Sequence, residues 1–202
     1  MGLELIALTD HNSAKNCPAA EKAAREYGIG FLPGVEVHTA EEVHCVCLFP
    51  DVSSAMRFDA MLYGHIPDIE NNEAIFGRQT IVAPDGTESS EHKLLITAAD
   101  ISVTELPDIV KKYGGIMYPA HVDRDANGLF AMLGMWPQDF NVCAAEYAHS
   151  DEGIPEGIVR IQASDAHYFE SMSENGFELP LASADFNGFA EYIQKEARKN
   201  DA

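Results

Sequence analysis

The stretch Ile158-Val159-Arg160-Ile161-Gln162-Ala163-Ser164-Asp165-Ala166-His167 decides the fold of this chain. Its first four residues are mostly apolar and β-branched, which predicts a short buried strand. Asp165 and His167 follow that strand two residues apart, and such positions point to the same side of an extended chain. A carboxylate and an imidazole would then face one point, as two ligands of one metal cluster do. Taken alone, the stretch is equally compatible with a surface turn that carries an Asp and a His.

The same arrangement recurs along the chain, because other apolar, strand-like runs are also followed by polar side chains. The predicted strands are residues 3–8, 34–37, 43–49, 116–121, 142–147 and 158–161. Helical patterns cover residues 13–27, 54–63, 102–113, 129–133 and 185–198, and Ser13, Ser102 and Asp185 are the predicted N-terminal caps of three of these helices. A repeated order of strand, loop, helix and strand favours a parallel β/α architecture.

The polar side chains at the strand ends are candidate metal ligands. In a β/α barrel, active sites collect at the carboxyl ends of the strands. The residues at such ends are His11, Glu36, His121, Asp165 and His167, whereas His44 lies near the start of its strand. Imidazoles and carboxylates suit zinc, manganese or iron. Two or more such ions clamp a phosphate ester and activate water, so the sequence predicts a multi-metal site that handles a phosphate.

Length and patterning indicate one domain that spans residues 1–202. The chain has 202 residues, 46% of them apolar, which is enough for a sizeable core. Residues from about 50 to 99 depart from the β/α pattern and are expected to form an insertion packed on the main body. Within it, residues 79–83 and 93–96 flank Asp85-Gly86, a dipeptide typical of hairpin turns, and are predicted to pair.

The charge of the chain restricts its partners. Net charge is −20, from 33 acidic and 13 basic residues, and no Lys/Arg cluster forms a basic track. A long nucleic acid is therefore not expected as a partner, whereas bound cations would let the site accept a small phosphorylated substrate. No apolar run approaches the ~20 residues that span a membrane, and no signal-peptide pattern is visible. A cytoplasmic protein without a membrane partner is expected.

Four motifs occur in order: Thr9-Asp10-His11, Gly34-Val35-Glu36, Pro119-Ala120-His121 and Ser164-Asp165-Ala166-His167. Together they resemble the motifs of the polymerase and histidinol phosphatase (PHP) superfamily, and Ala120-His121-Val122-Asp123-Arg124 resembles its stand-alone bacterial members. The resemblance implies a distorted seven-stranded, TIM-like β/α barrel that binds up to three divalent ions: zinc, manganese or iron. By the family pattern, Glu36, His44 and His121 share one metal, and Glu36 bridges to another. His11 and His167 serve a second metal, and Asp165 serves the third.

The sequence departs from the family pattern at its start. Members of the family begin with a strand that carries a His-x-His motif, whereas this sequence starts, by the same comparison, at what is normally the second strand. The resemblance then implies that the Glu36 site keeps its protein ligands and that the other two sites lack some. The strands at residues 3–8 and 158–161 would also lack a shared neighbour. Because unpaired strand edges favour association, a homo-oligomer is expected.

Residues and resemblance together predict a metal-dependent phosphoric ester hydrolase that cleaves a small phosphate ester or nucleotide through a metal-activated water. Asp10 is predicted to orient a ligand or water, and Arg124 to bind the phosphate, because guanidinium groups bind phosphate bidentately. Two alternatives stay open, an exonuclease of short oligonucleotides and a metal-binding module without turnover. His38 is expected in a loop or behind the ligands, and no family motif marks His149.

Overall fold

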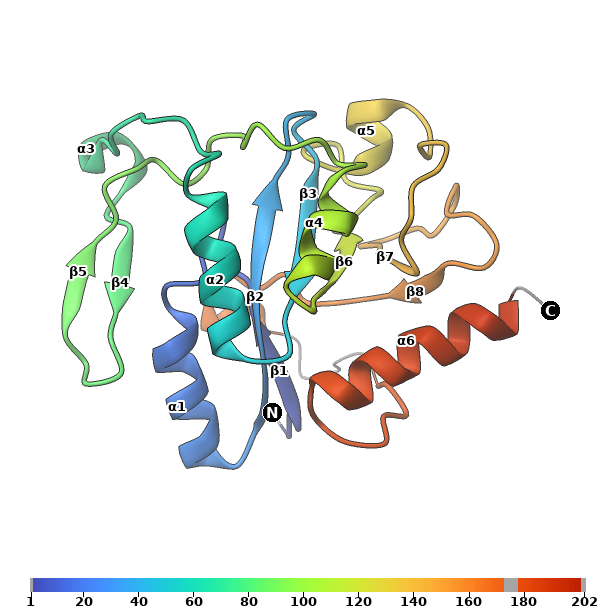
Figure 1. Cartoon of the computed structure of the whole chain (residues 1–202), viewed down its shortest axis with the longest axis horizontal. Coiled ribbons are helices and arrows are strands. Elements are labelled where there is room, and N and C mark those ends of the chain that lie inside the picture. The colour runs from blue at the N-terminus through green and yellow to red at the C-terminus, as the bar shows by residue number, and fades with distance from the viewer. Residues whose placement is uncertain (1, 173–177, 201–202) are drawn as a thin grey trace.

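A mixed sheet forms the centre of the computed structural model, which describes residues 2–172 and 178–200 (Figure 1). Its strands lie in the order β1 (Leu5–Leu8), β2 (Gly30–His38), β3 (His44–Leu48) and β6 (Ile116–Pro119). A parallel pair, β7 (Ala144–Glu146) and β8 (Val159–Ile161), continues beyond β6. The Val122 N–H after β6 donates a 2.8 Å hydrogen bond to the carbonyl of Glu146 in β7. The α/β class predicted from the sequence is confirmed.

Strand β3 runs antiparallel to both of its neighbours, β2 and β6, whereas β1 and β2 are parallel. The expected all-parallel arrangement is therefore wrong at β3. The reason is the short connection of residues 39–43, which allows a hairpin but not the crossover that a parallel strand needs. The sheets of the described residues are small and none of them closes, so the seven-stranded barrel is not confirmed.

The direction of β3 explains the position of His44. Because β3 is antiparallel, its first residue lies at the same edge as the last residues of β2 and β6. The register pairs His44 with His38, at the end of β2, and Cys45 with Pro119, at the end of β6. His44 therefore joins the polar edge of the sheet although it starts its strand.

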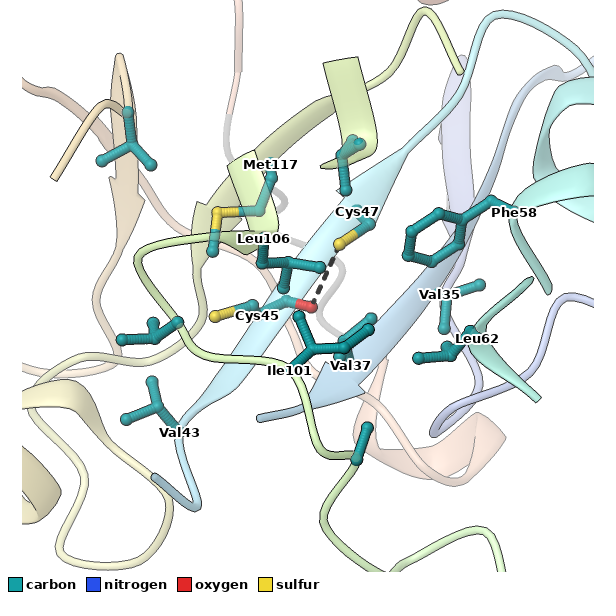
Figure 2. Packing of buried hydrophobic residues seen from close by; sticks show 14 of the residues in the cluster. Val35, Val37, Val43, Cys45, Cys47, Phe58, Leu62, Ile101, Leu106 and Met117 are labelled. Carbon is teal, nitrogen blue, oxygen red and sulfur yellow. Dashed lines mark hydrogen bonds between the residues drawn. The ribbon is translucent and has the colours of Figure 1, made fainter. Parts of the chain in front are cut away.

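The sheet has an apolar core on each face, because successive strand residues point to opposite sides. One core is built from Val35, Val37, Cys45 and Cys47, with Phe58 and Leu62 of α2 (Val52–Leu62) and Leu106 of α4 (Leu106–Lys112) (Figure 2). The other core contains Val46 and Leu48, with Phe186, Phe189 and Ile193 of α6 (Phe186–Asn200). Glu36 alternates with Val35 and Val37, so it points to the second face, at the carboxyl edge of the sheet. No helix in the described ranges is long and apolar enough to cross a membrane.

Two predicted helix starts are wrong, because tertiary contacts take the predicted capping hydroxyls. Helix α1 (Cys17–Tyr27) begins four residues after Ser13, whose hydroxyl donates to Asp59 at 3.2 Å. Helix α4 begins at Leu106, and the Ser102 hydroxyl donates to Glu41 at 2.7 Å. Each helix has proline in its first turn, a position that proline favours. The cap of α6 is confirmed, since the Gly188 N–H donates to Asp185 at 2.9 Å.

The region predicted as an insertion contains α2, α3 (Glu73–Phe76) and the hairpin β4 (Thr80–Val82) and β5 (Glu88–Ser90), which lies at one side of the molecule (Figure 1). The turn at Asp85-Gly86 is as predicted, but its second strand is not at residues 93–96. The Ala83 N–H donates to the Thr87 carbonyl at 2.8 Å, and this tight turn makes the very next residues pair. Beyond this region, α5 (Leu129–Leu133) has its predicted bounds, and a short 3₁₀ helix (Phe169–Ser171) follows the last candidate ligand.

Gly34 allows β2 to approach both of its neighbours closely. A Cβ atom at this position would lie 2.7 Å from the Cys47 carbonyl oxygen and 2.8 Å from Cγ2 of Thr9. Any larger residue would push β2 away from β3 and from the segment after β1. That segment carries His11, which forms an isolated parallel bridge with Glu36. The glycine thus helps to set the distance between these two candidate ligands.

Candidate metal centre

Three imidazoles surround the buried carboxylate of Glu36 at the carboxyl edge of the sheet. Nδ1 of His11 lies 3.1 Å from Oε2 of Glu36. Nδ1 of His44 lies 3.5 Å, and Nε2 of His121 3.4 Å, from Oε1 of the same carboxylate. His11 follows β1, His44 starts β3 and His121 follows β6, so the strand order brings the three imidazoles together.

This arrangement fits a divalent metal ion. Donor atoms of His11, Glu36 and His44 lie within 4.8 Å of one another. Around a four-coordinate ion with bonds of ~2.1 Å, neighbouring donor atoms lie about 3.4 Å apart, close to the spacing between the imidazoles and Glu36. Nδ1 of His121 is buried and has no hydrogen-bond partner among the described residues. The nitrogen of His121 that faces Glu36 is Nε2, so the unpartnered nitrogen lies on the other side of the ring.

Asp165 and His167 reach the same place from the end of β8. The ring centroids of His167 and His11 are 5.7 Å apart, although β8 and β1 lie at opposite ends of the row of strands. Oδ2 of Asp165 accepts a hydrogen bond from Arg124, and its Oδ1 lies 3.7 Å from Nδ1 of His167. All the predicted ligands line one cavity of about 440 Å³: His11, Glu36, His44, His121, Asp165 and His167.

The electrostatics of the site keep Glu36 ionised. Burial acts to raise the pKa of its carboxyl, but hydrogen bonds from His121 and His44 outweigh burial and hold the pKa far below its usual value. Burial acts to lower the pKa of His121, and the hydrogen bond and charge of Glu36 outweigh it, so that this pKa is raised. For His11, burial prevails over the attraction of Glu36 and lowers the pKa. An anionic carboxylate beside a neutral imidazole is a donor set that binds divalent ions.

Several residues of the site have a left-handed backbone conformation, which is unusual for residues other than glycine. The φ angles are 29° at His121, 45° at Asp165, 49° at Asn12 and 57° at Asn127. Such conformations cost on the order of 1 kcal/mol each and concentrate at functional sites. The fold thus holds two predicted ligands, His121 and Asp165, in a strained backbone conformation.

The two predicted catalytic residues lie in different surroundings. Arg124 lines the cavity beside Asp165. Asp10 accepts a hydrogen bond from the Asn16 side chain at 2.8 Å and does not line the cavity, although its carbonyl accepts the Glu36 N–H at 3.1 Å. His38 lies behind His44, with ring centroids 4.8 Å apart, and bonds to the Ile96 carbonyl at 3.0 Å.

Sequence reasoning missed Glu146, the last residue of β7. Its side chain is buried, and burial, with the charges of Asp165 and Glu36, raises its pKa to about 7 against the opposing effect of His121. The signal was the one used for Glu36, namely a carboxylate at the end of an apolar strand. Asp123 and His149 line the cavity. Asp123 stands in the stretch Ala120-His121-Val122-Asp123-Arg124 but was assigned no role there, and no family motif marks His149.

Solved structures share this arrangement of elements at low sequence identity. Endonuclease Q from Pyrococcus furiosus superposes with a TM-score of 0.64 and 18% identity, over 96% of this chain and 48% of that chain. Endonuclease Q in complex with a 27-mer duplex that carries an abasic lesion superposes with a TM-score of 0.62 and 16% identity, over 96% of this chain and 49% of that chain. A Bifidobacterium adolescentis protein proposed to be a metal-dependent phosphoesterase superposes with a TM-score of 0.52 and 18% identity, over 96% of this chain and 86% of that chain.

The chain therefore shares its fold with these structures. The resemblance read from the four motifs is thus confirmed at the level of the fold. The chain spans about half the length of the endonuclease Q chains and most of the Bifidobacterium chain. No protein-family model and no curated protein matches the sequence.

Proposed function

We propose that this chain is a metal-dependent phosphoesterase that hydrolyses a small phosphate ester or a nucleotide. The convergence of His11, Glu36 and His44 on one point, in a cavity that Asp165 and His167 also line, carries this proposal. The likeness to a protein proposed to be a metal-dependent phosphoesterase supports the same class of reaction.

Each candidate ligand has a proposed role. Glu36, His44 and His121 would hold one ion, His11 and His167 would hold a second with Glu36, and Asp165 would serve a third. Zinc, manganese and iron suit these donors. Bound divalent ions supply Lewis-acid activation of water and neutralise phosphate charge.

The chain's own residues complete the site. Arg124 presents a guanidinium to the cavity, where it can bind phosphate oxygens in place of its contact with Asp165. Asp10 supports the site through its carbonyl, which holds the backbone of Glu36 at 3.1 Å. Burial of Glu36 keeps water from screening its charge, which favours its interaction with bound cations.

A small substrate agrees with the size and charge of the chain. The cavity of about 440 Å³ is in the range of small-molecule sites, and a net charge of −20 opposes a long phosphate backbone. The likeness to endonuclease Q, which one structure shows with a duplex substrate, is in tension with this choice. Cleavage of a nucleic acid strand is therefore the second candidate, and a metal-binding module without turnover is the third.

One set of measurements separates these candidates. The protein is loaded with zinc, manganese or iron, its metal content is measured, and it is assayed on p-nitrophenyl phosphate, nucleoside monophosphates, short oligonucleotides and a duplex with an abasic site. We expect wild type to hydrolyse the monoesters. In Glu36→Gln, kcat/KM for the monoesters should fall at least ~100-fold and the metal content should fall with it. Glu152→Gln, which changes an exposed glutamate, is the matched control.

Each alternative outcome has a defined meaning. Cleavage confined to the oligonucleotides or the duplex would replace the phosphatase proposal with the nuclease. Full metal occupancy with no cleavage of any substrate would leave the binding module. A wild-type protein that binds no metal above the level of Glu36→Gln would contradict the proposed site itself.

A further inference from the structure

The carboxylate of Asp123 ties together two loops at the edge of the cavity. Its Oδ1 accepts the Ala148 N–H at 2.7 Å, and its Oδ2 accepts the N–H groups of His149 and Ser150 at 2.7 and 2.8 Å. Asp123 belongs to the loop after β6, and residues 148–150 belong to the loop after β7. One side chain thus fixes the backbone of three consecutive residues on the neighbouring loop.

The two loops form one wall of the metal cavity. The lining residues from these loops are Asp123, Arg124, Asp125, Ala126, Asn127 and His149. Asn127 is itself held in place, because its amide donates to the Glu42 carbonyl at 3.0 Å. The wall is therefore built on anchored backbone rather than on a loose loop.

His149 lines the cavity, and it is the residue that the neighbouring loop contributes to this wall. In the described part of the chain its ring makes no hydrogen bond and no ion pair, and the residue is exposed. Its backbone, in contrast, is fixed by Asp123. An uncommitted imidazole on a fixed backbone, at the wall of a cavity, is placed to contact a ligand there.

The order of the strands places His149 across from the main group of candidate ligands. His11, Glu36 and His44 come from β1, β2 and β3, whereas His149 follows β7, beyond β6 in the row. In phosphoryl transfer the attacking oxygen and the leaving oxygen lie on opposite sides of phosphorus. If water is activated near Glu36, the leaving group points to the wall that carries His149.

We propose that His149 contacts the substrate on its leaving-group side and that Asp123 is the positioning residue that holds it there. The inference rests on the proposed phosphoesterase function and adds to it a binding residue for the leaving group. As the bond from phosphorus to the leaving oxygen breaks, that oxygen gains negative charge, and an N–H of His149 donates a hydrogen bond to it. Substrates whose leaving groups are poor depend most on this contact.

Hydrogen exchange on the metal-free protein tests the role of Asp123 without any activity. In wild type, the amides of Ala148, His149 and Ser150 should exchange slowly, and in Asp123→Asn they should exchange at least ~10-fold faster, because an amide cannot accept all three bonds. Asp85→Asn, which changes another aspartate that accepts a backbone N–H, is the control. Unchanged protection in Asp123→Asn would overturn the positioning role.

Kinetics on two esters test the role of His149. We expect His149→Gln to lose about 100-fold in kcat/KM on an alkyl phosphate and less than ~10-fold on p-nitrophenyl phosphate, whose leaving group needs little help. Asp123→Asn should show the same split, and the double variant should be no worse than His149→Gln alone, since both act through one contact. His92→Gln, an exposed histidine away from the cavity, is the control.

The outcomes separate this inference from the proposed function. Equal losses on both esters, or additive losses in the double variant, would overturn the inference while the phosphoesterase stands. His149 is exposed, so its substitution does not threaten folding. If wild type cleaves no ester, the proposed function fails, and the contact is then tested by titrating phenyl phosphate into the metal-loaded protein. The ¹H–¹⁵N signals of the His149 ring must shift, and a silent ring would overturn the contact.

Discussion

Glu146→Gln should make the metal-free protein more stable at alkaline pH. Glu146 is 4% exposed, and the pKa of its carboxyl rises from 4.5 to about 7 in the folded chain. A carboxyl whose pKa is raised by folding costs no stability while it is protonated in both states. It destabilises the folded chain increasingly as pH rises from about 4.5 through about 7, and the effect is constant above that range. Glutamine has nearly the same shape and carries no charge, so it removes this cost.

The magnitude follows from the two pKa values. At pH 8.5 nearly the full difference applies, about 3.4 kcal/mol, whereas at pH 5.5 linkage leaves about 1.4 kcal/mol. The free energy of unfolding of Glu146→Gln relative to wild type should therefore increase by about 2 kcal/mol between these pH values. Urea unfolding in the presence of a chelator measures it, and Glu152→Gln, an exposed neighbour, should show no such increase. Parallel pH profiles for wild type and Glu146→Gln would refute the reasoning.

Two further predictions concern the frame of the site. Gly34→Ala should lower the free energy of unfolding by about 1–3 kcal/mol, because its Cβ would overlap the Cys47 carbonyl. Gly64→Ala, whose Cβ would have its nearest atom at 3.4 Å, should be nearly neutral. Equal urea midpoints for the two variants would contradict this prediction. Asn12→Ala removes bonds to the Leu95 and Thr97 carbonyls and to the His38 N–H, at 2.9, 2.9 and 3.0 Å. Asn12→Ala should lower the free energy of unfolding by about 2–3 kcal/mol and speed proteolysis near residues 91–99. If this variant is digested at the same rate as an Asn141→Ala control, the prediction is wrong.

The polar edge of the sheet could be predicted because it depends on strand ends alone. Once the apolar runs were identified, the carboxylates and imidazoles after them had to meet, and Glu36, His121 and Asp165 do line one cavity. His44 fitted that rule less well, because it lies at the start of its strand. The physical reason that it still joins the set, the antiparallel direction of β3, was present in the short connection at residues 39–43 but was not read from it.

Other features depend on partners that are distant in sequence. Ser13 looked like a helix cap, yet its hydroxyl bonds to Asp59, 46 residues away. No local pattern indicates that Asp123 binds three amides of another loop, or that His121 has a positive φ. Whether the sheet closes into a barrel was equally beyond the sequence, because the number of strands does not fix how the outer strands meet.

The approach of His167 to His11 has a mechanical consequence. These residues stand at the two ends of the row of strands, and no backbone hydrogen bonds join β1 to β8 in the described ranges. An ion bound by residues from both ends would link β1 to β8, and its binding free energy would stabilise the whole arrangement of strands between them. At a free ion concentration 1,000 times the dissociation constant, that contribution is about 4 kcal/mol. The concentration of free metal ions would then control how closely β1 approaches β8, as well as whether the site is active.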